Sequence, residues 1–387
     1  MIYLDNSATT KICDEALERY TEVSRECFGN PSSLHSAGYL AEKTVTEARK
    51  AILASLGARG AELIFTSSGS EANNLAIFGR AFAKERFRRG GKIITSEGEH
   101  ASVSAPIAEL ERQGFKVARI PTKGGKLDTG ALGRELSSDV ILVSVMMVNN
   151  ETGALYDIEG LSRLMRERSR EAVLHIDATQ SFMKCPLSMQ RLGADMITVS
   201  SHKIEGPKGI GALAVSDAII KSRGLSPMIL GGGQELGMRS GTENVPAIAA
   251  FAEAVRIASA SLSERAKKME GLRQRLIENL TRPPRLSEIS ITNPENHAPH
   301  ILNITLPGIK SETMLHYLSS LGIFVSSGSA CSSNSAHVSS ALLAYGRSER
   351  EADCSIRVSF SHRNTEDEID ELTRALDLGL QKLARIR

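Results

Sequence analysis

The sequence is poor in cysteine, and its five cysteines do not form a recognisable motif. Their number is odd, and no two of them have the Cys-x-x-Cys spacing. This pattern argues against a disulfide framework and against a zinc knuckle. Reduced thiols are typical of the cytoplasm, so we expect a cytoplasmic protein without a bound metal.

The sequence also lacks an excess of positive charge. Its formal net charge is +2, and its densest basic run comprises Arg86, Arg88, Arg89 and Lys92. We interpret this run as the solvated end of a helix. Recognition of nucleic acid usually needs a basic patch or stripe, so we expect no direct contact with nucleic acid.

Long apolar runs are missing as well. The longest, around residues 140–148, is shorter than ten residues and contains Ser144, whereas a membrane-spanning helix needs about 20 apolar residues. The run from Met1 to Asp5 does not combine a basic region with an apolar one, so we predict no signal peptide. We therefore expect no association with a membrane.

What is present is the composition of a globular protein. The chain has 387 residues, of which 41% are apolar and 24% are charged, which suits about two folded domains rather than disorder. Short β-branched runs alternate with helical patterns, for example at 71–88 and 159–168. This alternation favours βαβ units around a parallel sheet. The predicted strands lie at 62–66, 92–95, 116–120, 140–146, 172–176 and 196–199.

The pattern changes after residue 244. Residues 244–280 are typical of one long helix, and a proline-rich joint follows at 282–284. The remainder predicts a smaller α+β unit. Its expected elements are strands at 301–306, 323–325 and 355–360, a helix at 311–321 and a charged terminal helix.

In an open α/β sheet, ligands bind beyond the carboxyl ends of the strands, so the residues that follow each strand are the first candidates. Strand 62–66 leads into residues 67–71, Ser-Ser-Gly-Ser-Glu, and then into a helix. Small residues expose backbone N–H groups at the start of a helix, which suits a phosphate. A plain helix cap by Ser70 explains the same residues.

Two other strand ends carry titratable side chains. His100 follows strand 92–95, where a surface or core histidine is the simpler interpretation. Asp177 follows strand 172–176, where a carboxylate is costly unless a cation meets it. Asp177 is either a helix cap or the counter-ion of a bound cationic ring.

Strand 196–199 ends in Ser200-Ser201-His202-Lys203. A desolvated lysine amine at such a place has a lowered pKa, which suits attachment of a carbonyl compound as a Schiff base. A solvent-exposed lysine is the alternative. The Ser-x-x-Lys spacing also occurs in serine β-lactamases, but this sequence has no Ser-Asp-Asn or Lys-Thr-Gly partner.

The last candidate is Cys331, which lies in a loop rich in serine and glycine at 326–334. An inert thiol is more often buried, whereas a loop of this composition is exposed. Cys331 is therefore a candidate nucleophile.

Taken in chain order, these features resemble the cysteine desulfurases of the NifS/IscS type, within the class V aminotransferase family of pyridoxal phosphate (PLP) enzymes. The resemblance covers nearly the whole chain. Its further motifs are Tyr-Leu-Asp-Asn-Ser-Ala-Thr-Thr at 3–10, Gly-Asn-Pro-Ser-Ser at 29–33, Asn-Asn-Glu-Thr-Gly at 149–153, Gly-Gly-Gly-Gln-Glu at 231–235, Arg-Ser-Gly-Thr-Glu-Asn-Val-Pro at 239–246 and Ile-Arg-Val-Ser at 356–359.

The resemblance implies an α/β fold, that of the fold-type I PLP-dependent transferases. A large PLP-binding domain at 14–256 would contain a mainly parallel seven-stranded sheet. A smaller α+β domain, formed by 1–13 and 257–387, would carry the Cys331 loop.

The resemblance also implies a role for each candidate. Lys203 would bind PLP covalently, Asp177 would pair with the ring nitrogen, and His100 would stack on the ring and take part in catalysis. Arg357 would bind the substrate carboxylate, with Asn150 and Asn30 close by. The other cofactor contacts would come from Gly69, Ser70, Asn150, Gln180, Ser200, His202 and, across a homodimer, Thr242.

The implied reaction converts L-cysteine to L-alanine. The Cys331 thiolate would take the substrate sulfur as a persulfide and pass it to an iron–sulfur scaffold or to another acceptor, such as the tRNA thiolation route. Three alternatives stay open. They are another class V aminotransferase or lyase that does not use Cys331, a selenocysteine lyase, and a protein without catalysis that only binds PLP or docks to a scaffold.

This chain departs from the family at several positions. Glu205 stands where an aromatic residue is expected, and it brings a negative charge close to Lys203. Phe182 and Met183 replace smaller residues, and residues 332–337 have a sequence of their own. None of these changes removes an implied role.

Overall fold

The structure, a computed structural model, describes residues 1–88, 90–282, 285–327 and 338–383. Cys331 lies outside the described residues. The strands are β1 (Ile2–Tyr3), β2 (Ala61–Thr66), β3 (Lys92–Ser96), β4 (Lys116–Ile120), β5 (Val140–Met146), β6 (Val173–Asp177), β7 (Met196–Ser200), β8 (Gly211–Ser216), β9 (Ser290–Thr292), β10 (Ile301–Thr305), β11 (Ile323–Phe324), β12 (Ser326–Ser327) and β13 (Ser355–Ser359).

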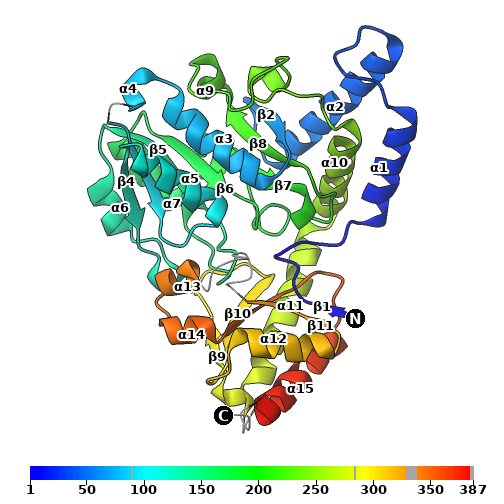
Figure 1. Cartoon of the computed structure of the whole chain (residues 1–387), viewed down its shortest axis with the longest axis vertical. Helices are drawn as coiled ribbons and strands as arrows, with labels where there is room; N and C mark the ends of the chain where they lie inside the picture. Colours follow the sequence, from blue (N-terminus) through cyan, green and yellow to red (C-terminus); the bar gives the residue numbers. More distant parts are fainter. Residues whose placement is uncertain (89, 283–284, 328–337, 384–387) are drawn as a thin grey trace.

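The helices connect these strands and cover both sheets (Figure 1). They are α1 (Asp14–Glu26), α2 (Ser36–Ser55), α3 (Gly69–Phe82), α4 (Glu85–Arg88), α5 (Ala101–Arg112), α6 (Thr129–Glu135), α7 (Ile158–Arg168), α8 (Met189–Leu192), α9 (Asp217–Lys221), α10 (Val245–Ala260), α11 (Leu262–Leu280), α12 (Ser311–Ser320), α13 (Ser340–Tyr345), α14 (Glu349–Asp353) and α15 (Glu366–Leu383).

The larger sheet has seven strands in the order β2-β8-β7-β6-β5-β3-β4. Strand β8 runs antiparallel to both of its neighbours, and the other neighbouring strands are parallel. The prediction of a mainly parallel seven-stranded sheet is confirmed. Strand β5 is buried along its whole length, as an apolar strand at the centre of a parallel sheet should be.

Helices cover both faces of this sheet, so its apolar residues form two cores. On one face, Leu75 of α3 and Ile107 of α5 are buried against the sheet. On the other, Ile52 of α2, Met165 of α7 and Phe251 of α10 belong to a second buried cluster. The sheet is therefore packed between helices on both faces, which fixes the carboxyl ends of its strands in place.

A smaller unit lies below the large sheet in Figure 1, with the N-terminus beside it. Its antiparallel sheet has the order β12-β13-β10-β9, and helices α11, α12 and α15 contribute to its core. The start of the chain joins this unit, because β1 pairs with β11 and Leu4 is buried in the same core. The domain boundaries at 13/14 and 256/257 stay a prediction.

The prediction of one helix over 244–280 is wrong. Helices α10 and α11 meet at a 74° bend, because Ser261 between them leaves the helical conformation, with φ −132° and ψ 20°. Likewise, the predicted helix at 71–88 is interrupted between α3 and α4. Among the described residues, no single helix is long and apolar enough to cross a membrane, and the bent pair α10–α11 passes that test only by its combined length and composition.

Candidate active site

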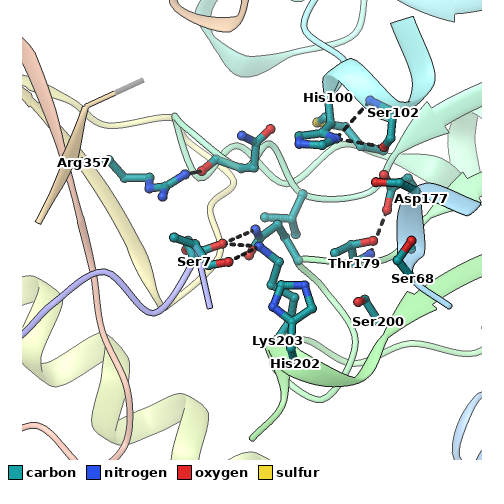
Figure 2. A pocket seen from close by; sticks show the side chains of 17 residues that line it. Ser7, Ser68, His100, Ser102, Asp177, Thr179, Ser200, His202, Lys203 and Arg357 are labelled. Carbon is teal, nitrogen blue, oxygen red and sulfur yellow. Dashed lines mark hydrogen bonds between the residues drawn. The ribbon is translucent and has the colours of Figure 1, made fainter. Parts of the chain in front are cut away.

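A cavity of about 270 Å³ lies at the carboxyl ends of the parallel strands, between the large sheet and the smaller unit (Figure 2). Ten of the predicted cofactor or substrate residues line it, because parallel strands end at one edge of a sheet. Its lining residues are Ser7, Ala8, Ser68, Gly69, Ser70, His100, Ser102, Met146, Val148, Asn150, Asp177, Thr179, Gln180, Ser200, His202, Lys203 and Arg357.

One end of the cavity has the properties of a phosphate cradle. Helix α3 begins there, and its cap is Ser68 rather than Ser70, since the Glu71 N–H donates to Ser68 Oγ over 3.2 Å. A Cβ atom at Gly69 would lie 3.3 Å from both the Ser200 Cβ and the Thr179 Oγ1. The buried Ser200 Oγ has no hydrogen-bond partner in the described part of the chain. Free N–H groups at a helix start and an unpaired hydroxyl fit a phosphate.

The Asp177 carboxylate lies at the floor of the cavity, at the end of β6, where it is buried. It accepts hydrogen bonds from Asn73 Nδ2 and from the Thr179 N–H, each over 2.9 Å. Both donors are neutral. A buried carboxylate with only neutral donors fits the counter-ion of a cationic ring, and no helix begins at Asp177 to support the alternative of a cap.

The Lys203 side chain enters the cavity from the loop after β7 (Figure 2). Its Nζ donates to the carbonyl oxygens of Ser7 over 2.5 Å and Ala8 over 2.8 Å. The neighbouring His202 ring lies 3.1 Å from Thr9 Oγ1, measured from Nδ1, and burial lowers the His202 pKa to about 4. The Lys203 amine is thus held by two backbone carbonyls beside a neutral imidazole.

The residues 7–9 that hold Lys203 and His202 were given no role by sequence reasoning. They belong to the family-like run at 3–10, and Ser7 is fully buried although it is polar. That run of polar residues at the start of the chain was the available signal.

His100 lies on the far side of the cavity from Lys203 in Figure 2, at the start of α5. Its Nδ1 accepts from the Ser102 N–H over 3.1 Å and lies 2.8 Å from Ser102 Oγ. Burial lowers the His100 pKa. An Nδ1 that accepts from the backbone places the ring proton of neutral His100 on Nε2.

Behind His100 lies Glu99, a buried acid that sequence reasoning missed. Its carboxyl group accepts from Ser96 Oγ and from the Met146 N–H at 2.9 Å. Burial raises the Glu99 pKa to about 8. A neutral Glu99 near Asp177 adds no second negative charge beneath the cavity.

Arg357, on β13, closes the opposite end of the cavity from Ser68 and Ser200 (Figure 2). Its Nη1 donates to the Asn150 carbonyl over 2.8 Å, and its Nη2 lies 3.0 Å from Asp5 Oδ1. The Nε is buried and has no partner among the residues that the structure describes. The guanidinium is therefore held by two partners while its remaining N–H groups are left for a ligand.

Gln180 lines the same cavity, but two predicted residues do not. Gln180 Nε2 donates to the Ser7 carbonyl over 2.9 Å. Thr242 lines a separate cavity of about 230 Å³ together with Ser67. Asn30 is exposed, and its Oδ1 accepts from the Ser32 N–H, so its role in substrate binding stays a prediction.

The family model described as aminotransferase class-V matches residues 2–372 of the chain. The chain belongs to the class V aminotransferase family. Among its curated relatives, a NifS/IcsS protein homolog of Lactobacillus delbrueckii subsp. bulgaricus is 40% identical, with coverage of 100% of this chain and 99% of the relative. Cysteine desulfurase IscS 1 of Archaeoglobus fulgidus is 38% identical, with coverage of 99% and 98%.

Solved structures agree with this class V assignment. A NifS-like protein superposes with a TM-score of 0.90 at 35% identity, with coverage of 98% of this chain and 99% of that one. The resemblance and the fold predicted from the sequence are both confirmed.

Proposed function

We propose that this protein is a PLP-dependent cysteine desulfurase, which converts L-cysteine to L-alanine and transfers the sulfur as a persulfide on Cys331. The observation that carries the proposal is the set of groups in one cavity. The Lys203 amine faces the same cavity as a phosphate cradle and a buried carboxylate, and Arg357 lies at the end opposite Ser68 and Ser200 (Figure 2). This arrangement suits an amino acid held by its carboxylate beside a PLP ring.

The chain offers a site for each part of PLP. The start of α3 at Gly69 and Ser70, with Ser200 and His202, would hold the phosphate. Asp177 would pair with the ring nitrogen, His100 would lie on the ring, and Gln180 and Asn150 would lie near the ring oxygen. Lys203 would attach the cofactor covalently. Bound there, PLP supplies an electron sink for the substrate Cα.

Arg357 and Lys203 then act on the substrate. Arg357 would bind the carboxylate with its guanidinium, which Asp5 and the Asn150 carbonyl already orient. When it is not bound to the cofactor, the Lys203 amine would take the Cα proton, and it lies at the edge of the cavity with hydrogen bonds to the carbonyls of residues 7–8. Binding and proton transfer are thus assigned to two different residues of one cavity.

Cys331 would complete the reaction. Its thiolate attacks the sulfur of the substrate, an S–S bond forms, and the C–S bond breaks. The electron pair of the broken bond goes to the substrate carbon, which takes up a proton to give the methyl group of alanine. Sulfur remains on the enzyme as the Cys331 persulfide until an acceptor removes it.

The experiment that tests this function is the Cys331→Ala variant, with Cys27→Ala at a buried thiol as its control. We expect Cys331→Ala to release no sulfide from L-cysteine while it keeps the visible absorption of bound PLP. Mass spectrometry of the wild-type protein with L-cysteine should show one added sulfur atom on Cys331. Full sulfide release by Cys331→Ala would instead indicate a class V enzyme that does not use this cysteine.

The partners of the reaction are proposed on the same basis. We propose a homodimer, because Thr242 is exposed and lines a cavity that adjoins the phosphate turn through Ser67, where a second copy could reach it. Light scattering and the Thr242→Ala variant test this, since a monomer with unchanged PLP affinity would contradict it.

We propose an iron–sulfur scaffold or a tRNA thiolation protein as the acceptor of the sulfur. Selenocysteine is the alternative substrate, and its turnover is to be compared with that of L-cysteine.

A further inference from the structure

Glu205 is a buried carboxylate two residues after Lys203, at a position where the family resemblance leads us to expect an aromatic residue. Its side chain is 8% exposed. Its backbone has φ +65°, which is unusual for a residue other than glycine. A buried charge and a left-handed backbone are both costly, so the surrounding structure must compensate for them.

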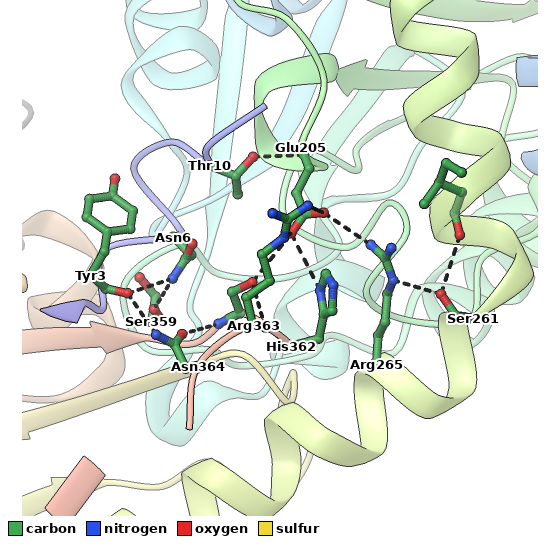
Figure 3. Close-up of polar contacts among 12 residues, drawn as sticks. Tyr3, Asn6, Thr10, Glu205, Ser261, Arg265, Ser359, His362, Arg363 and Asn364 are labelled. Carbon is green, nitrogen blue, oxygen red and sulfur yellow. Dashed lines mark hydrogen bonds and ion pairs between the residues drawn. The ribbon is translucent and has the colours of Figure 1, made fainter. Parts of the chain in front are cut away.

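Three basic side chains from outside the large sheet surround the Glu205 carboxylate (Figure 3), and the Ser361 hydroxyl donates to it over 3.4 Å. Arg265 Nη1 on α11 lies 3.4 Å from Oε2, and Arg363 Nε lies 3.4 Å from Oε1. His362 Nδ1 lies 3.5 Å from Oε1. We call Glu205, Arg265, His362 and Arg363 the Glu205 cluster. Burial lowers the His362 pKa, so the two arginines carry the compensating charge.

The backbone of the same loop is tied to the start of the chain. The Glu205 N–H donates to Thr10 Oγ1 over 2.8 Å, and the Cys13 N–H donates to the Glu205 carbonyl over 2.9 Å. The Thr10 N–H donates to the His202 carbonyl over 2.9 Å. The loop that carries Lys203 is therefore held by the first residues of the chain as well as by the ion pairs.

The partners of Glu205 are continuous with the other end of the active site. His362 and Arg363 follow β13, the strand that carries Arg357. Phe360, at the end of this strand, is buried in the core of the smaller unit. A small cavity of about 30 Å³ is lined by Lys203, Glu205 and Phe360, among others, so the cluster lies directly behind the lysine.

We propose that Glu205 is a positioning residue that sets the distance between Lys203 and Arg357. Its ion pair with Arg363 joins the loop that carries Lys203 to the segment that follows Arg357 in the chain. The proposal rests on the roles proposed above for these two residues. Its physical basis is that one buried carboxylate is shared by two guanidinium groups on different elements, so neither element can move without loss of an ion pair to Glu205.

The test compares Glu205→Gln and Glu205→Asp with Asp370→Asn as a matched control. Asp370 on α15 pairs with Arg275 of α11 over 2.6 Å. The control therefore breaks an ion pair made by α11, the helix that also carries Arg265, at a place away from Lys203. We expect Glu205→Gln to raise the KM for L-cysteine roughly tenfold and to change kcat less than about threefold. Glu205→Asp, which keeps the charge, should recover part of the loss, and the control should keep the wild-type KM.

Hydrogen exchange of the protein without substrate gives a second readout that does not depend on activity. In Glu205→Gln, exchange should become faster in peptides that cover residues 10–13, 200–206 and 357–364, and it should stay unchanged there in the control. If Glu205→Gln does not fold, Arg363→Gln replaces it, because the Arg363 side chain is 43% exposed and its loss is milder.

An unchanged KM together with unchanged exchange at 200–206 would overturn the proposal. Faster exchange everywhere, with kcat and KM altered in parallel, would also overturn it, because Glu205 would then only stabilise the fold. Failure of the proposed function has a different signature. It would appear as sulfide release by Cys331→Ala, which leaves the exchange result unaffected.

Discussion

The cavity and the Glu205 cluster are both lined by buried polar groups, but they differ in how these groups are paired. In the cavity, Ser200 Oγ and Arg357 Nε have no hydrogen-bond partner among the described residues. In the Glu205 cluster, the carboxylate meets two arginines and a histidine. Buried polar groups are usually paired. In the cavity, these unpaired groups are candidates to bind a ligand, whereas the paired Glu205 carboxylate links the elements that carry the binding residues.

The comparison predicts the largest loss of activity where a cavity group does the chemistry itself. Lys203→Ala removes the amine proposed to attach PLP and to move the Cα proton, so we expect kcat for sulfide release to fall by a factor on the order of 10³–10⁴. Lys208→Ala, at an exposed position on the same loop, is the control. Steady-state kinetics and the visible spectrum check this, and near-normal kcat in Lys203→Ala would contradict the proposed role.

A smaller loss is expected at the floor of the cavity. Asp177→Asn keeps the shape but removes the charge proposed to face the ring nitrogen, so kcat should fall roughly 10²- to 10³-fold. The control is Asp195→Asn. Asp195 pairs with Arg166 over 2.5 Å and precedes β7 at the edge of the sheet opposite the cavity. If both variants lose activity equally, Asp177 is a structural carboxylate like Glu205.

Arg357 should affect binding more than chemistry. Arg357→Lys keeps a positive charge but loses the planar fork, so we expect the KM for L-cysteine to rise roughly 10- to 50-fold with a smaller change in kcat. Arg347→Lys is the control, because Arg347 pairs with Glu351 outside the cavity. A fall in kcat at constant KM would show that Arg357 acts on the reacting atoms rather than on the carboxylate.

Sequence reasoning located most of the cavity because its signals are local. Short runs with β-branched residues predicted strands such as β4 and β5 to the residue. Parallel strands end at one edge of a sheet, so the polar residues after them, including Asp177 and Lys203, had to lie close together. Family resemblance then assigned their roles.

The Glu205 cluster could not be predicted in the same way. Glu205 meets Arg265 and Arg363, which lie 60 and 158 residues further along the chain. No local sequence pattern marks such a pair. The only indication in the sequence was the negative charge of Glu205 at a position where an aromatic residue is expected. The bend at Ser261 was missed for a related reason. The residues on both sides of it favour helix, and the packing of α11 in the smaller unit decides where the helix breaks.

At Glu99, a buried acid beneath the cavity that accepts hydrogen bonds from Ser96 and from the Met146 N–H, we expect an effect on stability rather than on kcat or KM. Its pKa is about 8 in the folded protein and 4.5 when unperturbed. Between these values the folded state holds a proton that the unfolded state has lost, so the free energy of unfolding falls as pH rises, by up to about 1.4 kcal/mol per pH unit.

Glu99→Gln is neutral at every pH and lacks this contribution. The difference in unfolding free energy between variant and wild type should therefore grow in favour of the variant from about pH 5 to pH 8 and then level off. Urea unfolding at several pH values measures it, with Glu97→Gln as the exposed control. A constant difference would mean that Glu99 is ionised in the folded protein. A second negative charge would then lie beneath the cavity, and Asp177 would not be the sole counter-ion that the proposed PLP site requires.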